Sequence, residues 1–321
     1  MEELLKVSDL KTYFFTHEGT VKAVDGIGFS IKQGETLGIV GESGCGKSVT
    51  ALSIMRLIAD PPGKIVSGEV FFEGKNLLEL DNKEIRDIRG KKISMIFQEP
   101  MTSLDPVFTI GYEIMETLQI HQGLKKQEAR QKAIEALKIV GMPDAEKRVD
   151  SYPHELSGGM RQRAMIAMAL SCNPTLLIAD EPTTALDVTI QAQILRLIND
   201  LKMKLGTSVM LITHDLGVIA EMCDHVAVMY AGHIVEYSDV DTLFSNPLHP
   251  YTKGLNKSIP RLDLEVERLD AIKGLVPNLI DLPAGCPFHP RCDYWSKTCL
   301  KDMPPLTEVE NRHLAKCHLY R

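Results

Sequence analysis

The sequence predicts an α/β fold with a mainly parallel sheet, on the strength of three observations. Over residues 1–250, short apolar runs alternate with helical runs, and strands separated by helices form the βαβ units of parallel sheets. An almost purely helical stretch at roughly 108–170 interrupts this alternation. It indicates an inserted helical subdomain, which we place at about 99–170. From about residue 245 prolines become frequent, so we expect a tail of turns, loops and short elements.

The elements of the α/β pattern follow from their residues. Leu37–Val40 is a strand candidate that leads through a glycine-rich turn into a helix expected at Ser48–Ile58. Within the helical stretch, Gln127–Val140 has an apolar face with helical spacing, made of Ala129, Ala133, Ala136, Leu137 and Val140. The next strand, helix and two strands are expected, in this order, at Leu176–Ala179, Ile190–Leu205, Val209–Ile212 and Val226–Met229.

Length and composition limit the class of protein. A chain of 321 residues suggests about two domains, which we place at 1–250 and 251–321. The net charge of −7 argues against a nucleic-acid-binding protein, since such domains are usually strongly basic. A hydrophobic content of 44% excludes a wholly disordered chain. The apolar runs are shorter than the ~20 residues of a membrane span, and the acidic N-terminus does not resemble a signal peptide. We therefore expect a cytosolic protein.

The strongest motif is Gly41-Glu-Ser-Gly-Cys-Gly-Lys-Ser48, which fits G-x-x-x-x-G-K-[ST] between a strand and a helix. In this arrangement backbone N–H groups surround nucleotide phosphates, Lys47 supplies a cation, and the Ser48 hydroxyl can bind Mg²⁺. Cys45 occupies a variable position. It is either a small filler residue or a thiol made acidic by the helix N-terminus.

Two weaker motifs follow. The apolar run Thr175–Glu181 ends in two carboxylates; Asp180 is suited to hold Mg²⁺, and Glu181 is suited to orient or deprotonate a water. The run Leu156-Ser-Gly-Gly-Met160 precedes a helix. It is either a second anion site or an ordinary helix N-cap centred on Ser157.

Six motifs in this order resemble the nucleotide-binding subunit of an ABC transporter. They are the Walker A motif, the Q-loop glutamine, the signature, the Walker B motif, the D-loop and the switch histidine, found here at Gly41–Ser48, Gln98, Leu156–Met160, Leu176–Glu181, Ala185–Asp187 and His214. Met160 stands where the family signature has Gln. The resemblance implies a P-loop NTPase core of the ABC type, with a mainly parallel sheet, an antiparallel β subdomain, the inserted α-helical subdomain and a Cys-rich C-terminal extension.

The resemblance also implies roles for individual residues. It makes Glu181, His214 and Gln98 the catalytic set. It implies contacts to ATP and Mg²⁺ from Tyr13, Gly41, Glu42, Ser43, Gly44, Cys45, Gly46, Lys47, Ser48, Val49, Gln98 and Asp180. Phe14 and Phe15 are alternatives to Tyr13 as the aromatic residue beside adenine, and packing in a strand core is the other explanation for all three. The signature and D-loop residues expected to meet ATP on an opposing subunit are Ser157, Gly158, Gly159 and Asp187.

The tail over residues 246–317 resembles the C-terminal extension of ATPases from dipeptide and oligopeptide importers. The similarity lies in Asn246–Thr252, Gly274–Pro277 and Leu282–Cys292. Four cysteines follow the spacing C-x5-C-x6-C-x17-C, namely Cys286, Cys292, Cys299 and Cys317. The resemblance implies that they ligate a 4Fe-4S cluster.

The residues themselves leave other interpretations of these cysteines open. The spacing lacks the C-x2-C pair usual in structural zinc sites, although four thiolates can hold zinc. Unligated or disulfide-bonded cysteines are a further alternative. His289, His313 and His318 are either substitute ligands or solvated loop histidines. The cluster is either structural or a redox sensor.

Taken together, the motifs predict an ATP-hydrolysing subunit that energises uptake of dipeptides or oligopeptides. The resemblance implies a peripheral position on the cytoplasmic face of the cell membrane. It also implies two transmembrane permease subunits, a second ATP-binding subunit (a paralogue or a second copy) and, indirectly, an extracytoplasmic peptide-binding protein. No nucleic-acid partner is expected. The alternatives are an importer of nickel or another small ligand and a soluble ABC ATPase of translation or DNA repair. A single motif set without heptads disfavours the soluble ATPase.

Overall fold

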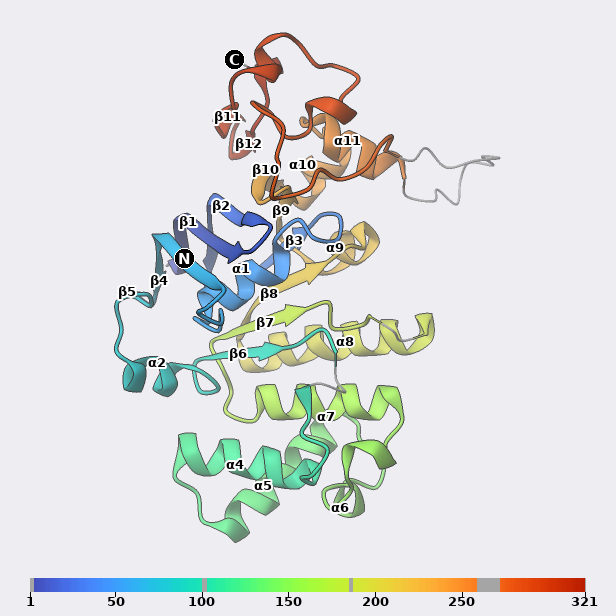
Figure 1. Cartoon of the computed structure of the whole chain (residues 1–321). Coiled ribbons are helices and arrows are strands. Elements are labelled where there is room, and N and C mark those ends of the chain that lie inside the picture. The colour runs from blue at the N-terminus through green and yellow to red at the C-terminus, as the bar shows by residue number, and fades with distance from the viewer. Residues whose placement is uncertain (1–2, 100–102, 185–186, 259–271, 321) are drawn as a thin grey trace. The chain divides into compact units, whose positions relative to one another are not determined.

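A computed structural model describes residues 3–99, 103–184, 187–258 and 272–320 (Figure 1). The chain divides into two compact units. Of the described residues, those within 32–35 and 79–211 form the helical unit, and those within 3–31, 36–78 and 212–320 form the sheet unit. Each unit is described separately below.

The helical unit carries the predicted helical insertion. Strand β6 (Ile93–Ile96) pairs in parallel with β7 (Leu176–Asp180), and β8 (Ser208–Thr213), most of which lies in this unit, follows β7 in the sheet order. The helices of the insertion lie between β6 and β7 in sequence (Figure 1). Helix α2 precedes β6 in the chain, and helix α8 follows β7. In chain order the helices are α2 (Asn82–Ile88), α4 (Ile110–Gln122), α5 (Lys126–Ile139), α6 (Ala145–Arg148), η1 (Pro153–Glu155), α7 (Gly158–Leu170) and α8 (Val188–Leu205).

Local sequence accounts for where these helices begin and end. The Thr109 hydroxyl accepts the N–H of Tyr112 at the start of α4, and Gly123 ends α4 in the left-handed conformation, the usual role of glycine at a helix C-terminus. Helix α5 buries Ala129, Ala133 and Leu137, which recur every four residues. The amphipathic face predicted for Gln127–Val140 is therefore confirmed.

The sheet unit contains the expected antiparallel β subdomain. Its four-stranded sheet has the order β2-β1-β4-β5, and β1 pairs antiparallel with β4, as β4 does with β5. The strand bounds are β1 (Glu3–Thr16), β2 (Gly19–Lys32), β4 (Gly63–Phe72) and β5 (Lys75–Asn76).

A second group of strands in the sheet unit positions the phosphate-binding loop. The order is β11-β12-β10-β9-β3, in which β3 and β9 are parallel and the other pairs are antiparallel. The bounds are β3 (Thr36–Val40), β9 (His225–Tyr230), β10 (His233–Asp239), β11 (Thr307–Glu310) and β12 (His313–Ala315). The helices of this unit are α1 (Lys47–Ile54), α9 (Leu216–Met222), α10 (Val240–Ser245) and α11 (Pro250–Lys257).

Two details differ from the sequence prediction. Helix α1 ends at Ile54 instead of Ile58, because Arg56 adopts a φ of 52° that a right-handed helix cannot contain. Helix α8 begins two residues earlier than expected, at Val188, because the carboxylate of Asp187 caps it.

The tail is more closely packed than its proline content suggests. Besides the short 3₁₀ turns η2 (His289–Arg291), η3 (Thr298–Leu300) and η4 (His318–Tyr320), it supplies β11 and β12 to the sheet. Phe288 belongs to the same hydrophobic core as Tyr230 and Tyr251, and Cys286 and Cys292 pack against that core. The core of the sheet unit therefore includes residues of the extension.

Candidate functional site

The phosphate-binding loop connects the fully buried strand β3 to α1. Gly46 is the N-cap residue of α1 and has a φ of 106°, a conformation that residues other than glycine rarely adopt. A Cβ at Gly46 would also collide with the backbone oxygen of Ala23. Ser43 and Gly44 at the tip of the loop are exposed, so the backbone there is accessible to a ligand.

Lys47 lies under this loop with only 5% of its surface exposed. Its Nζ donates to the carbonyl oxygens of Gly41, at 2.8 Å, and Glu42, at 3.2 Å. The ammonium group is thereby held at the start of the loop. A buried cation beside accessible amides is the chemistry that binds a polyphosphate.

The idea that Cys45 has an acidic thiol is wrong. The side chain is fully buried, and burial raises the pKa of the thiol, outweighing the opposing effect of Lys47. A buried, neutral thiol is a weak nucleophile. Cys45 therefore fits the other interpretation, that of a small residue that fills space.

The two other sequence-predicted residues of the sheet unit lie in strand β1 and after β8. The hydroxyl of Tyr13 donates to Asp25 at 2.7 Å, and Lys22 Nζ lies 5.8 Å from the ring centroid. Burial raises the pKa of Tyr13 to about 12, with a further contribution from Asp25. Its ring stays half-buried, like that of Phe14, whereas Phe15 is exposed. His214 is exposed at the turn between β8 and α9.

In the helical unit, the structure brings Gln98 and Glu181 together. Gln98 follows β6, Glu181 follows β7, and the Gln98 amide donates to the Glu181 carboxylate at 3.0 Å. The hydroxyl of Thr184 donates to the same carboxylate oxygen at 2.9 Å. Glu181 has a φ of 45°, a strained conformation of the kind that concentrates at functional sites. Asp180 is buried at the end of β7.

The signature residues form the start of α7. The hydroxyl of exposed Ser157 accepts the N–H of Met160 at 3.4 Å, so the N-cap interpretation is correct for this chain. Gly158 and Gly159 open the helix and are half-buried. In the N-cap interaction the Ser157 oxygen accepts a hydrogen bond, so its O–H can still donate to an anion, and the two roles do not conflict.

The D-loop is only partly described. Ala185 and Leu186 lie outside the described residues. The carboxylate of Asp187 accepts the N–H of Ile190 at 3.0 Å and caps α8. In this structure Asp187 therefore acts as a helix cap.

The four tail cysteines line one cavity of about 310 Å³. All are free thiols. Burial raises the pKa of Cys286 to about 11 and also raises those of Cys292 and Cys317. Within the described parts of the chain, no group of three or more His, Cys, Asp or Glu side chains is placed to hold a metal ion. The metal site expected from the sequence is thus not found in the structure, whereas the four thiols do surround a common space.

The three tail histidines differ from one another. His289 and His318 line the cysteine cavity, and their ring nitrogens pair with the carbonyl oxygens of Cys286 and Asp302. His313 is buried, with its Nε2 2.7 Å from Glu236. The interpretation of His313 as a ligand or as a solvated loop residue is therefore wrong, because it belongs to a buried polar pair.

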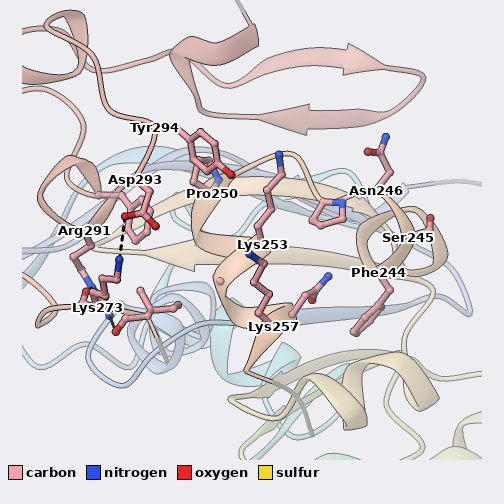
Figure 2. Close-up of a pocket in the computed structure, with 15 residues that line it drawn as sticks. Phe244, Ser245, Asn246, Pro250, Lys253, Lys257, Lys273, Arg291, Asp293 and Tyr294 are labelled. Carbon is pink, nitrogen blue, oxygen red and sulfur yellow. Dashed lines mark hydrogen bonds and ion pairs between the residues drawn. The ribbon is translucent and has the colours of Figure 1, made fainter. Parts of the chain in front are cut away.

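Sequence reasoning missed Arg291 and Tyr251, which both contact Glu42 of the phosphate-binding loop. The Arg291 guanidinium pairs with the Glu42 carboxylate at 2.6 and 3.0 Å, and the Tyr251 hydroxyl accepts the Glu42 N–H at 2.9 Å. Arg291 also lines a pocket of about 830 Å³ with Lys273 and Asp293 (Figure 2). Two features of the sequence could have drawn attention to this pair: Arg291 precedes a cysteine of the tail cluster, and Glu42 is an acidic residue at a variable position of the phosphate-binding loop.

Comparison with known proteins identifies the family. The family model described as "ABC transporter" matches residues 24–184. The chain belongs to the ABC transporter family. It is an ATPase of the ABC type, and the resemblance predicted from the six motifs is confirmed. A second model, described as "Oligopeptide/dipeptide transporter, C-terminal region", matches residues 235–299 of this ABC transporter chain.

Relatives of this ABC ATPase extend over its full length. A probable peptide ABC transporter ATP-binding protein of Sinorhizobium fredii is 57% identical, with 98% of this chain and 94% of the relative covered. The oligopeptide transport ATP-binding protein AppD of Bacillus subtilis is 55% identical, with 100% and 98% covered. The ABC cassette MJ0796, solved as a dimer in a post-hydrolysis state with ADP and Pi, has a TM-score of 0.66 and 29% identity, with 74% of this chain and 98% of that chain covered.

This solved cassette supports the ABC ATPase fold predicted from the sequence. In the described part of the ABC chain, every helix is too short or too polar to cross a bilayer.

Proposed function

We propose that this chain is the ATP-hydrolysing subunit of an importer of dipeptides or oligopeptides. The observation that carries the proposal is the match of residues 235–299 to the C-terminal region of oligopeptide and dipeptide transporters. The near full-length identity to ATP-binding proteins named for peptide and oligopeptide transport supports it. We divide the chain into an ATP-binding domain at 1–250 and a transporter-specific extension at 251–321.

In this proposal Asp180, the last residue of β7, and Glu181, which follows it, have different chemical roles. In the helical unit Asp180 would be a Mg²⁺ ligand; in the sheet unit the Ser48 hydroxyl would be a Mg²⁺ ligand, and Lys47 and the loop amides would hold the phosphates. Glu181 orients and deprotonates the attacking water, and Gln98, at 3.0 Å from it, keeps its carboxylate in place. His214 contacts the γ-phosphate, and the ring of Tyr13 stacks on adenine.

The assembly follows from the same assignment. Two ATP-binding subunits, paralogues or copies, bind two ATP molecules between them, and Ser157, Gly158, Gly159 and Asp187 of each subunit contact the ATP of the other. Two transmembrane permeases receive the movement at the cytoplasmic face of the membrane. A peptide-binding protein outside delivers the substrate.

Reconstitution tests the transport function. The chain is assembled with its permeases and binding protein in proteoliposomes, and uptake of labelled dipeptides and oligopeptides is measured with ATP inside or outside. We expect ATP-dependent peptide uptake that stops with Glu181→Gln. Uptake of nickel without peptides would replace the proposal with the small-ligand alternative, and ATPase activity independent of any permease or substrate would favour the soluble one.

We also propose that Cys286, Cys292, Cys299 and Cys317 hold a 4Fe-4S cluster. All four thiols line one cavity of about 310 Å³, about ten times the ~30 Å³ that one water occupies in the liquid. A zinc ion would need all of its ligands at ~2.3 Å from one point. Four thiolates around a larger space are the usual donor set for an iron–sulfur cluster, which would supply a cross-link between the tail loops.

Metal analysis of anaerobically purified protein tests this donor set. We expect iron and acid-labile sulfide in similar amounts, a brown colour, and loss of both in Cys292→Ser and Cys299→Ser. Cys172→Ser is the matched control, because Cys172 is a half-buried thiol of the helical unit and its loss should leave the iron in place. Zinc without iron would replace the cluster with a zinc site, and protein without metal would overturn both.

A further inference from the structure

The tail and the phosphate-binding loop are joined by one ion pair. Arg291 Nη1 donates to Glu42 Oε2 at 2.6 Å, and Nη2 donates to Oε1 at 3.0 Å. The Arg291 side chain is 4% exposed and that of Glu42 is 29% exposed. Two parallel charge-assisted hydrogen bonds fix distance and direction together, so the carboxylate of Glu42 has one preferred position.

Arg291 is itself held by the extension and the core. Its Nε donates to the Lys273 carbonyl oxygen at 2.9 Å, and its guanidinium lies 5.8 Å from the Tyr230 ring centroid and 6.0 Å from that of Phe288. An arginine side chain stays positively charged at every relevant pH. Figure 2 shows Arg291 beside the exposed Lys273–Asp293 pair on the pocket wall.

The backbone of Glu42 is held as well. Its N–H donates to the Tyr251 hydroxyl at 2.9 Å, and its carbonyl oxygen accepts from Lys47 Nζ at 3.2 Å. Glu42 is thus contacted on its carboxylate and on its amide by residues from beyond position 250. On its carbonyl oxygen it meets the lysine expected to bind the phosphates.

We propose that Arg291 is a positioning residue of the ATP site, so that the Cys-rich extension sets the affinity for nucleotide. Arg291 does not touch the nucleotide in this proposal. It acts through Glu42, fixing the first residues of the loop and the direction of Lys47, and it neutralises a carboxylate that would otherwise repel the phosphates. The inference rests on the assignment of Gly41–Ser48 as the ATP site.

The location of Arg291 in the chain connects the Arg291–Glu42 ion pair to the cysteine cavity. Arg291 ends the 3₁₀ turn η2, and the next residue, Cys292, donates its N–H to the carbonyl oxygen of His289. Phe288 and Arg291 lie between two cavity-lining cysteines. Arg291 therefore links Glu42, through the ion pair, to a chain segment that begins and ends with a cysteine of the cavity.

A double-mutant cycle on the full chain tests the proposal. MgATP binding and the KM and kcat for ATP are measured for wild type, Arg291→Gln, Glu42→Gln and the double variant. We expect Arg291→Gln to raise the Kd and KM roughly tenfold, with a smaller change in kcat, because residues in direct contact are energetically coupled and the loop loses its fixed position. The double variant should bind ATP no more weakly than Arg291→Gln alone. Arg291→Lys should fall between wild type and Arg291→Gln, because a lysine keeps the charge without the fork.

Two further variants separate the possible failures. Lys273→Gln removes an exposed cation of the same pocket wall and should leave the Kd unchanged. Lys47→Ala should abolish ATP binding; if it does not, the ATP-site assignment itself fails. If Lys47→Ala abolishes binding while Arg291→Gln leaves the Kd unchanged, or if the effects of Arg291→Gln and Glu42→Gln are additive, the positioning role is overturned. Should Arg291→Gln not fold, Arg291→Lys and Glu42→Gln give the same comparison.

Discussion

The Gln98 amide and the Glu181 carboxylate meet at 3.0 Å, although the two residues are 83 positions apart in the sequence. Gln98 lies just beyond the end of β6, and Glu181 is the first residue after β7; the two strands are parallel neighbours. Because parallel strands present their carboxyl ends at the same edge of a sheet, the pairing places the Q-loop and the Walker B motif side by side. Glu181 combines this contact with a second one from Thr184 and a strained φ of 45°.

Replacing Glu181 with Gln should slow hydrolysis by ~10²-fold or more, because removing a general base typically costs that much. Size and hydrogen-bonding capacity are kept, so MgATP binding should change little. Steady-state turnover of the assembled transporter and ATP binding to the chain measure the two effects. Glu135→Gln, an exposed substitution on α5, is the control. Wild-type turnover by Glu181→Gln would rule out this assignment.

Replacing Ser157 with Arg should abolish ATP hydrolysis in the assembled pair while the isolated chain still binds MgATP. The reason is that the long cation intrudes where the opposing subunit's phosphates are expected. Thr109→Arg is a matched control, because Thr109 caps α4 with a similar hydrogen bond, 3.3 Å against 3.4 Å for Ser157. Equal loss of binding in the isolated Ser157→Arg chain would instead show that Ser157 serves its own nucleotide.

Replacing Gly46 with Ala should cost more stability than replacing Gly123. Both glycines have positive φ, 106° and 66°, but a Cβ at Gly123 meets no atom within 4 Å, whereas one at Gly46 meets the backbone of Ala23. We expect the free energy of unfolding to fall by about 1 kcal/mol in Gly123→Ala and by at least about 3 kcal/mol in Gly46→Ala. Gly46→Ala should also lose ATP binding. Denaturant unfolding and nucleotide titration measure both; similar effects of the two substitutions would contradict the expectation.

Stability should fall as the pH is lowered from about 7 to 4, in part through His249. Burial lowers the pKa of His249 to about 4, and its Nδ1 accepts the N–H of Tyr251 at 3.1 Å, which requires the neutral ring. The unfolded chain binds this proton near pH 6.5 and the folded chain does not. The contribution is therefore fully present above about pH 6.5 and is lost toward pH 4, on the order of 3 kcal/mol. Glu236, which favours the charged form, and Lys253, which opposes it, face the same ring.

Urea unfolding of wild type and His249→Asn between pH 7 and 4.5 measures this effect. An asparagine can cap α11 through its side-chain oxygen but does not titrate in this range. The variant should therefore have a shallower pH dependence, with His233, whose pKa burial also lowers to about 4, supplying part of the remainder. Identical pH profiles would exclude a role for His249.

The sequence by itself determined the class of the fold and the identity of the family. The strand–turn–helix at Gly41–Ser48 and the helical periodicity of Gln127–Val140 depend only on neighbouring residues, because loop geometry and amphipathic spacing are local properties. The order of the six motifs along the chain identified the family. The catalytic roles of Gln98 and Glu181 were implied by the family resemblance alone, and their hydrogen bond was found only in the structure.

Only the tertiary structure decided the contacts of residues far apart in sequence. The local pattern of His313 was that of a loop histidine, yet it is buried against Glu236, 77 residues away. Arg291 and Glu42 are separated by 249 residues, and neither position has a spacing that predicts the other. Which distant charges meet depends on how strands and loops pack, because an ion pair forms only where folding brings the two charged groups close together. For that reason the sequence predicted the phosphate-binding loop, and the structure was needed to find the arginine that holds it.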